Sequence, residues 1–224
     1  MTSEQSEPTS AAERPGQPKS QPDHYFASDP QVPSEPDQVE LLLPDLSLSL
    51  GVDRGVFSRG GIDMGTRLLL LESPAPDPGV EHVLDLGCGY GPIAMALAHR
   101  APDATVWAVD VNPRAIGLCA ANAAAAGFAE RVRAVQPDAV PPDVRFDLIW
   151  SNPPIRIGKV ALHQLLTTWL ERLTPGGRAV LVTQRHLGAD SLTDWLNAQG
   201  WPTNRMLSRR GYRLLDVRAR TATP

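Results

Sequence analysis

The run Val83-Leu84-Asp85-Leu86-Gly87-Cys88-Gly89-Tyr90-Gly91 decides the fold class of this 224-residue chain. Its first four residues are typical of a short, mostly apolar strand. Three alternate glycines then let the chain turn sharply, and without Cβ atoms they allow a ligand to approach the backbone. The spacing is G-x-G-x-G and not the G-x-G-x-x-G of dinucleotide sites, and an acidic residue stands two places before the first glycine. This pattern suits a cationic ligand better than a pyrophosphate.

The sequence that follows this turn alternates between strand-like and helix-like patterns. We expect helices over 91–100, 113–126, 159–173 and 189–199, and strands over 82–86, 105–109, 132–135, 146–151, 178–183, 203–208 and 212–218. Such alternation predicts an α/β fold with a doubly wound, mostly parallel seven-stranded sheet, in which the last two strands form an antiparallel pair. Ligands of such sheets bind at the carboxyl ends of the strands, near the point where the strand order reverses.

The segment before this sheet is predicted to be a small appendage. Residues 39–43 and 46–52 form a hairpin around Pro44-Asp45, and Asp63 is placed to cap a helix over 64–72. Residues 73–79 contain three prolines and form a stiff linker. We therefore divide the chain into a disordered tail over 1–22, an N-terminal hairpin and helix extension over 23–79, and a main domain over 80–224.

Charge is distributed unevenly along the chain. Residues 1–50 carry nine acidic and two basic residues, whereas residues 51–224 carry 16 acidic and 19 basic ones, so an acidic tail precedes a mildly basic folded part. The N-terminus has neither the charged start nor the apolar core of a secretory signal, which predicts a cytoplasmic protein. Two cysteines exclude a disulfide framework or a zinc cluster from this chain alone, and no metal is expected. Cys88 is expected to fit the turn as a small residue and not to act as a nucleophile.

Two further acidic residues follow the next two predicted strands. Asp110 ends the strand 105–109, where such folds place a carboxylate that accepts hydrogen bonds from ribose hydroxyls, and Asp138 follows the strand 132–135. A carboxylate at Asp138 could accept from the exocyclic amine of an adenine. Each alone could be a helix cap or a turn former. Together with Asp85 they stand at three successive strand ends, which favours a nucleoside cofactor site.

The second motif is Ser151-Asn152-Pro153-Pro154, at the end of the strand 146–151. Two prolines fix φ at about −65° and remove two donors, so the carbonyls can point outward. The Asn152 side-chain oxygen and the Pro153 carbonyl would then accept the two hydrogens of an amino group on a flat ring and aim its lone pair at a methyl group. Positioning would carry most of the catalysis, without a strong base. Alone, the motif could be a strand stop with a proline turn.

These two motifs in this order resemble class I S-adenosylmethionine-dependent methyltransferases over about 80–218. The resemblance implies S-adenosylmethionine as cofactor: the Asp85 position and the glycine turn meet its methionine part, the Asp110 position holds the ribose and the Asp138 position faces the adenine. The cofactor residues so implied are Phe57, Asp85, Gly87, Cys88, Gly89, Gly91, Asp110, Val111, Asn112, Asp138, Ala139 and Asn152, and the catalytic residues are Asn152, Pro153 and Pro154. An NAD-dependent dehydrogenase is the competing interpretation, but its glycine spacing differs and it leaves Asn-Pro-Pro unexplained.

A closer resemblance extends over about 23–224. The run from Asn152 to Lys159, with 57–66 upstream and Gly211-Tyr212-Arg213 downstream, is similar to the small-domain family related to ribosomal small-subunit RNA guanine-N2 methyltransferases. The chain has Ile155 where an aromatic residue often follows Asn-Pro-Pro, and it lacks the duplicated N-terminal half of longer members. The resemblance implies methylation of guanine N2 in 16S ribosomal RNA, with ribosomal RNA or the small ribosomal subunit as partner, no membrane, and Phe57 close to the cofactor. The sequence does not determine the oligomeric state, with a monomer favoured.

Basic residues gather near the transfer motif and at the C-terminus, where six arginines fall within 205–220. Such a cluster could hold RNA phosphates or could simply be solvated. The expected substrate-binding residues are Ile155, Arg156, Lys159, Arg209, Arg210 and Arg213. Two alternatives stay open: an N-methyltransferase of a protein amide or small-molecule amine, and a cofactor-binding protein without catalysis. Ile155 and the basic C-terminus weigh against the first, and the intact Asn152-Pro153 weighs against the second.

Overall fold

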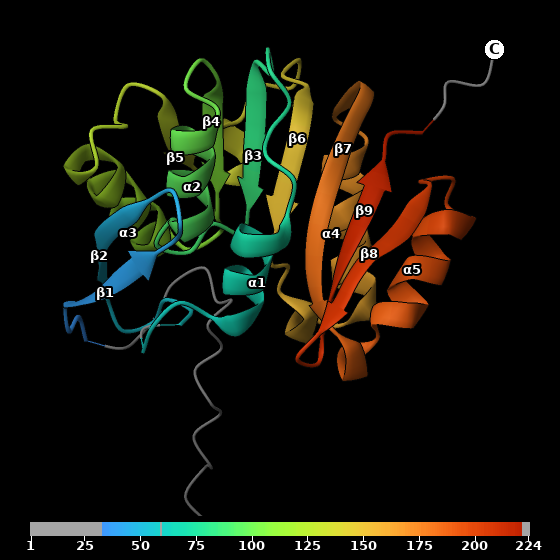
Figure 1. The fold of residues 1–224 in the computed structure, drawn as a ribbon, viewed down its shortest axis with the longest axis horizontal. Coiled ribbons are helices and arrows are strands. Elements are labelled where there is room, and N and C mark those ends of the chain that lie inside the picture. The colour runs from blue at the N-terminus through green and yellow to red at the C-terminus, as the bar shows by residue number, and fades with distance from the viewer. Residues whose placement is uncertain (1–32, 59, 221–224) are drawn as a thin grey trace, which may run out of the picture.

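The computed structural model describes residues 33–58 and 60–220, so the predicted tail over 1–22 lies outside the described residues. Figure 1 shows a central twisted sheet with helices on both faces and a small hairpin packed beside it. The predicted α/β fold with a mostly parallel seven-stranded sheet is confirmed.

The large sheet has the strand order β5-β4-β3-β6-β7-β9-β8. Pairing is parallel from β5 to β7 and antiparallel on both sides of β9. The order reverses between β3 and β6, because β4 and β5 extend the sheet on one side of β3 and β6 continues it on the other. The strands are β3 (His82–Leu86), β4 (Thr105–Val109), β5 (Val132–Val135), β6 (Phe146–Ser151), β7 (Leu173–Gln184), β8 (Thr203–Arg209) and β9 (Tyr212–Arg218).

Helices cover the two faces and enclose two apolar cores. One face carries α1, α2 and α3, and its core includes Met95 of α2 together with Val83 and Trp150 of the sheet. The other face carries α4 and α5, whose Leu166 and Leu196 pack with Ile149. The helices are α1 (Met64–Glu72), α2 (Pro92–Arg100), α3 (Pro113–Ala125), α4 (Lys159–Leu170) and α5 (Ala189–Ala198), with short 3₁₀ turns at Pro137–Ala139, Ile155–Ile157 and Arg185–Leu187.

The N-terminal extension packs on the first of these cores. Strands β1 (Asp37–Leu42) and β2 (Ser47–Val52) form an antiparallel hairpin whose buried Leu41 and Leu50 belong to the same core as α2. Asn122 of α3 holds the hairpin, since its side chain accepts from the Gly51 N–H and donates to the Gly51 carbonyl. Arg100 binds Asp45 in the hairpin turn, with an Nε to Oδ2 distance of 2.7 Å. The extension is therefore attached to the sheet by both apolar and polar contacts.

Two predicted boundaries, the end of α4 and the start of β7, were wrong. The helix expected to reach residue 173 ends at Leu170, and β7 begins at Leu173 although we expected its strand to start at 178. Pro175 is incompatible with a continuing helix. At Gly177 an added Cβ would lie 2.9 Å from the Phe146 carbonyl oxygen, so only glycine lets this irregular stretch of β7 approach β6 closely. The other predicted strands of the large sheet match the structure within a residue.

Candidate active site

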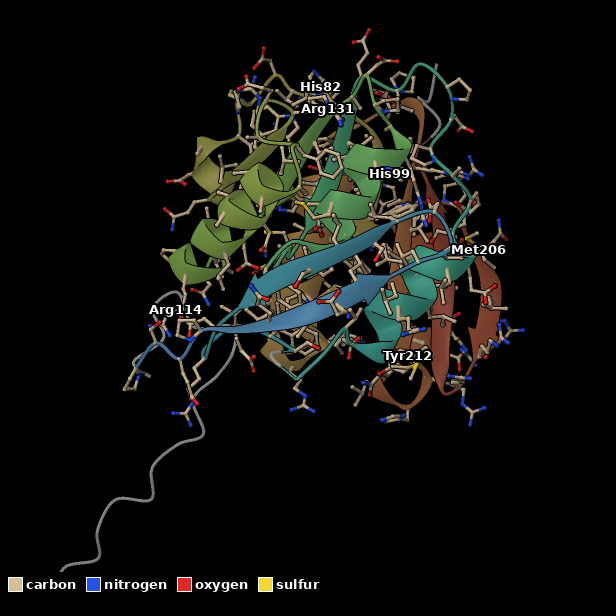
Figure 2. The ribbon with its side chains drawn as sticks, turned by 60° about the vertical axis from the view of Figure 1, so that its left-hand side comes forward. His82, His99, Arg114, Arg131, Met206 and Tyr212 are labelled. Atoms are coloured by element: carbon tan, nitrogen blue, oxygen red, sulfur yellow. The ribbon has the colours of Figure 1, made fainter. Side chains whose placement is uncertain are left out.

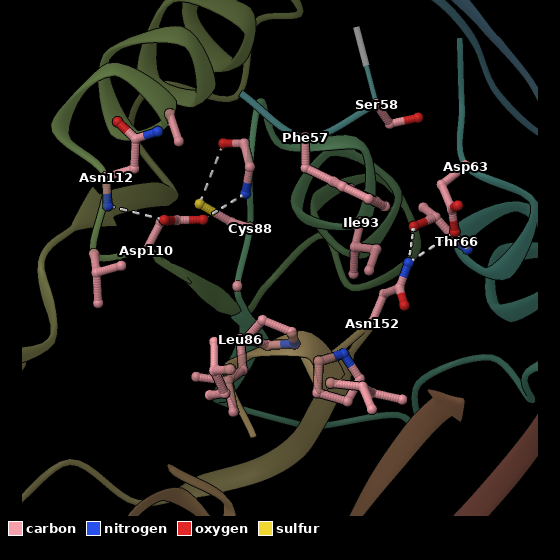
Figure 3. A pocket seen from close by; sticks show the side chains of 18 of the residues that line it. Phe57, Ser58, Asp63, Thr66, Leu86, Cys88, Ile93, Asp110, Asn112 and Asn152 are labelled. Carbon is pink, nitrogen blue, oxygen red and sulfur yellow. Dashed lines mark hydrogen bonds between the residues drawn. The ribbon is translucent and has the colours of Figure 1, made fainter. Parts of the chain in front are cut away.

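A cavity of about 550 Å³ opens where the strand order reverses, at the carboxyl ends of β3 and β6. One end is lined by the glycine turn after β3 and by the end of β4, and the other by Asn152 and the residues after it. Phe57 of the extension, 41% exposed, lines the same cavity. Figure 3 shows Cys88, Asp110, Phe57 and Asn152 around this space. The fold thus brings both sequence motifs and the extension to one cavity.

The glycine turn is fixed by backbone and carboxylate hydrogen bonds. The N–H groups of Gly87 and Cys88 donate to the Val109 carbonyl at 2.8 and 3.0 Å. Gly89 has φ 55° and donates its N–H to Asp110 Oδ2 at 2.9 Å. Asp110 Oδ1 accepts the Asn112 N–H at 2.9 Å, and burial raises the pKa of Asp110. Asp110 therefore braces the turn and also lines the cavity, with lone pairs left for ligand hydroxyls.

Asp85 lies directly behind this turn and is completely buried. Its Oδ2 accepts the Ala94 N–H of α2 at 2.9 Å, whereas its Oδ1 has no hydrogen-bond partner among the described residues. Burial raises the pKa of Asp85 well above its usual range. Asp85 is not among the described residues that line the cavity, so a cationic ligand group above the turn would act on its carboxylate from the other side of the turn and favour its charged form. The residues present fit S-adenosylmethionine, which carries an ammonium, a sulfonium and ribose hydroxyls.

Several predicted cofactor residues have other partners or positions. Gly91 does not line the cavity: an added Cβ would lie 2.7 Å from Cys119 Sγ, so this glycine lets α2 and α3 approach. Cys88 is buried, and its contact with the Cys119 thiol together with burial raises its pKa, the opposite of an activated nucleophile. Asn112 lines the cavity and caps α3, and its Nδ2 donates to the Gly55 carbonyl.

The residues predicted to lie near the adenine differ from those that line this part of the cavity. Val111 lines the cavity and is exposed. Asp138 and Ala139 are exposed and are not among the residues that line it, and Pro137 lines the cavity in their place. None of the three residues of the 3₁₀ turn at Pro137–Ala139 is buried. The role of Asp138 toward an adenine stays a prediction.

At the transfer end, the Asn152 amide is held in one orientation. Its Nδ2 donates to Asp63 Oδ2 at 2.9 Å and to Thr66 Oγ1 at 3.0 Å, as Figure 3 shows. Both amide hydrogens are thereby used, and no residue within 33–58 or 60–220 donates a hydrogen bond to the Oδ1 atom. Asp63 also caps α1 through the N–H groups of Gly65 and Thr66. The sequence predicted the cap but not the bond across 89 residues to Asn152.

The two prolines form part of the cavity wall. Pro153 is buried, and its carbonyl accepts the Ile155 N–H at 2.8 Å, so one lone pair remains for a substrate. The Pro154 carbonyl accepts the Ile157 N–H at 3.1 Å and closes the 3₁₀ turn. The carbonyls are therefore less free than the sequence suggested, because the chain turns back on itself directly after the motif.

The predicted substrate residues fall into three groups. Ile155 and Arg156 line the cavity, and Lys159 lines a smaller neighbouring cavity of about 140 Å³. Arg209 pairs with Glu72 at 2.6 Å and Arg210 contacts Met64 Sδ at 3.9 Å. Arg213 is 8% exposed and forms an ion pair with Asp190, so it is not a solvated cation available to a phosphate. None of the six arginines within 205–220 is among the described residues that line the cavity.

Sequence reasoning missed several cavity residues. Gln184 at the end of β7 and Tyr212 at the start of β9 line it, together with Trp169 and Leu165 of α4. No sequence signal marked Gln184, whereas Tyr212 belongs to the run Gly211-Tyr212-Arg213 that carries part of the family resemblance. Among residues 33–58 and 60–220, no group of three or more His, Cys, Asp or Glu side chains is placed to hold a metal. Nor is any helix in that part of the chain long and apolar enough to span a membrane.

Comparisons with known proteins agree with this geometry. The family model described as the methyltransferase small domain matches residues 47–215. An uncharacterized Bacillus subtilis protein, YbxB, is 33% identical over 201 residues, which cover 88% of this chain and 98% of the relative. The ribosomal RNA small subunit methyltransferase C of Shewanella halifaxensis is 37% identical over 137 residues, which cover 59% of this chain and 39% of that protein.

A solved structure is also similar. The T. thermophilus 16S rRNA N2 methyltransferase, in complex with AdoMet and guanosine, superposes with a TM-score of 0.67 and 26% identity. The match covers 85% of this chain and 52% of that one. This chain therefore spans about half the length, or less, of the ribosomal RNA methyltransferases that it resembles.

Proposed function

This chain belongs to the methyltransferase small domain family, and on that premise we propose that it transfers a methyl group to guanine N2 in small-subunit ribosomal RNA. S-adenosylmethionine is the methyl donor, and when bound it supplies an electrophilic methyl group on a sulfonium. The two named relatives support RNA as the substrate: one is a small-subunit ribosomal RNA enzyme and the other a 16S rRNA N2 enzyme.

The observation that carries the proposal is the orientation of Asn152. Because Asp63 and Thr66 take both hydrogens of its amide, the Oδ1 atom presents an acceptor. The cavity that Asn152 lines is shared with the glycine turn. An acceptor is what an amino group needs, since the amine donates its hydrogens and keeps its lone pair for the methyl carbon.

The chain supplies positioning and electrostatic stabilisation. Asn152 Oδ1 and the remaining lone pair of the Pro153 carbonyl would hold the two hydrogens of the amine and orient its lone pair toward the glycine-turn end of the cavity. S-adenosylmethionine held there would supply the methyl group and leave as S-adenosylhomocysteine. Both oxygens also stabilise the positive charge that develops on nitrogen during transfer. Apolar walls from Phe57, Ile155 and Trp169 shield the reaction from water.

The test uses tritium-labelled S-adenosylmethionine and ribosomal subunits from a strain that lacks the gene. We expect label in the small-subunit RNA, and nuclease digestion with mass spectrometry should locate it as N2-methylguanosine at one position. An Asn152→Ala protein that binds cofactor is the matched control and should transfer label about 10²-fold or more slowly. Label in large-subunit RNA, in ribosomal protein or in no fraction would refute the assignment. Large-subunit RNA is a real competitor because one relative, from Shewanella amazonensis, is a ribosomal RNA large subunit methyltransferase G at 31% identity over 65% of this chain and 40% of that protein.

A further inference from the structure

Two polar side chains continue the row that begins at Asn152. Asn152 follows β6, Gln184 ends β7, which runs parallel to β6, and Tyr212 starts β9, which runs antiparallel to β7. All three positions therefore lie at the same edge of the sheet, and Gln184 and Tyr212 are register partners. All three side chains line the large cavity. The order along the edge is glycine turn, Asn152, Gln184, Tyr212.

Helix α1 brings Tyr212 close to the Asn152 amide. A Cβ added at Gly65 would lie 2.9 Å from Tyr212 Cε1 and 2.9 Å from Asp63 Oδ2, so the tyrosine ring and the carboxylate that holds Asn152 flank the same point. Figure 2 shows Tyr212 beside α1. Gly65 is buried, and only a glycine leaves room for this approach. The three polar groups consequently share the α1 side of the sheet.

The hydrogen bond between Gln184 and Tyr212 fixes what each presents to the cavity. Gln184 Nε2 donates to the Tyr212 hydroxyl oxygen at 3.2 Å. This leaves Gln184 Oε1 as an acceptor and the Tyr212 O–H as a donor. Burial and the nearby Asp63 carboxylate raise the pKa of Tyr212, so the hydroxyl keeps its proton at neutral pH. Along the sheet edge, the cavity is therefore offered an acceptor at Asn152 Oδ1, a second acceptor at Gln184 Oε1 and a donor at the Tyr212 hydroxyl.

We propose that Asn152, Gln184 and Tyr212 together form a guanine-reading subsite, in which Asn152 Oδ1 accepts from N2, Gln184 Oε1 accepts from N1–H and the Tyr212 hydroxyl donates to O6. This rests on the proposed function and names how its base is selected. Guanine presents donor, donor, acceptor in this order along its Watson–Crick edge. With their amino group at Asn152, adenine and cytosine would set a ring-nitrogen acceptor against Gln184 Oε1. Sites that hydrogen-bond a base in this way reject analogues that leave a polar group unpaired.

The test measures, by NMR titration, how tightly nucleosides bind to the full chain saturated with S-adenosylhomocysteine. Guanosine is compared with 2-aminopurine riboside, which keeps the 2-amino group but has an unprotonated N1 and no O6. We expect guanosine to bind about tenfold or more tightly, since two hydrogen bonds differ. Tyr212→Phe and Gln184→Met should each bring this ratio several-fold closer to one. The exposed Gln199→Met, which makes the same change at the end of α5, should leave the ratio unchanged.

Inosine separates the contributions of Gln184 and Tyr212 to base binding from that of the Asn152 amide. It keeps N1–H and O6 but lacks the 2-amino group, so its binding should weaken with Tyr212→Phe and should respond little to Asn152→Ala. Equal binding of guanosine and 2-aminopurine riboside by the wild-type protein would overturn the proposal without any variant having to fold. If that protein nevertheless methylates guanine N2 in ribosomal RNA, the subsite is wrong and the proposed function stands. If the ratio is as expected but methyl transfer goes to another molecule, the proposed function fails and the guanine subsite stands.

Discussion

The bond between Asp63 and Asn152 yields a sharp prediction about catalysis. Asn152 has two partners on its Nδ2, but they differ in kind: the Thr66 hydroxyl can donate or accept, whereas the Asp63 carboxylate can only accept. Only Asp63 therefore distinguishes the productive amide orientation from the flipped one. Without it, a flipped amide would present donors to the substrate amine.

The magnitude follows from the type of bond that is removed. A hydrogen bond to a charged group contributes about 1.5–3 kcal/mol. If Asp63→Ala removes this orienting energy from the transition state, kcat should fall by about 10- to 100-fold. The affinity for S-adenosylmethionine should change by less than about threefold, because the glycine turn, Asp85 and Asp110 are untouched. Loss of the cap on α1 should also lower the free energy of unfolding by about 1 kcal/mol.

A second variant separates capping from orientation. Asp63→Ser keeps an N-cap acceptor for α1, but its shorter and uncharged side chain cannot hold Asn152. Its thermal unfolding should approach that of the wild type while its kcat stays as low as that of Asp63→Ala. The measurements are single-turnover methyl transfer, calorimetric titration with S-adenosylmethionine, and thermal denaturation. Wild-type kcat in Asp63→Ser would refute the reasoning, and so would a loss confined to cofactor affinity.

The remaining predictions concern the cofactor, the transfer step, the extension and the basic segment. Asp110→Ala should weaken S-adenosylmethionine binding by about 1–3 kcal/mol in calorimetry, and unchanged affinity in a folded protein would exclude a ribose contact. Asn152→Ala should lower turnover by about 10²-fold or more with cofactor affinity largely intact; a parallel fall in both would make it a cofactor ligand or a structural residue. Asn122→Ala leaves backbone groups of Gly51 and Tyr90 without partners and should lower the free energy of unfolding by about 2–4 kcal/mol in denaturant titration, whereas a decrease below about 0.5 kcal/mol would mean that water replaces the amide. Arg209 and Arg210 are the two exposed cations at the β8–β9 turn. Replacing both by Gln should flatten the salt dependence of RNA binding by about 0.7–0.9 log unit for each phosphate that is no longer neutralised, and an unchanged slope would show that both side chains are only solvated.

Most of the fold could be predicted because local patterns and the sheet agree. The strands β3 to β6 are short, mostly apolar runs that are followed within two residues by glycine, proline or an acidic residue, so both their existence and their ends are visible in the sequence. The start of β7 was not, because Pro175-Gly176-Gly177 is typical of a turn and here forms an irregular part of the strand. Strand pairing across a register shift depends on Phe146, which lies far earlier in the chain.

The strand pattern of the sequence predicted two cavity residues directly, because each follows the end of a strand. Asp110 and Asn152 follow their strands directly, and the fold then places both at the cavity. Arg213 was misjudged because an arginine in a basic run is usually solvated, whereas this one is buried and pairs with Asp190 of α5. The partnership of Gln184 with Tyr212 depends on which strands are neighbours, a property that no local pattern contains.

Three asparagines show why the extension belongs to the chemistry of the site. Asn112 caps α3, Asn122 lies within α3 and Asn152 follows β6, and each makes side-chain hydrogen bonds to the extension. The first two hold the segment that carries Phe57 over the cavity. The third reverses the relation, because there the extension holds the asparagine. The N–H groups of Gly87, Cys88 and Gly89 donate to Val109 and Asp110, so the backbone of the glycine turn is held by contacts within the sheet unit. The direction of the transfer amide is set from outside it, by a carboxylate at the start of α1. Cofactor binding and methyl transfer are therefore separable by mutation at Asp63, even though one cavity serves both.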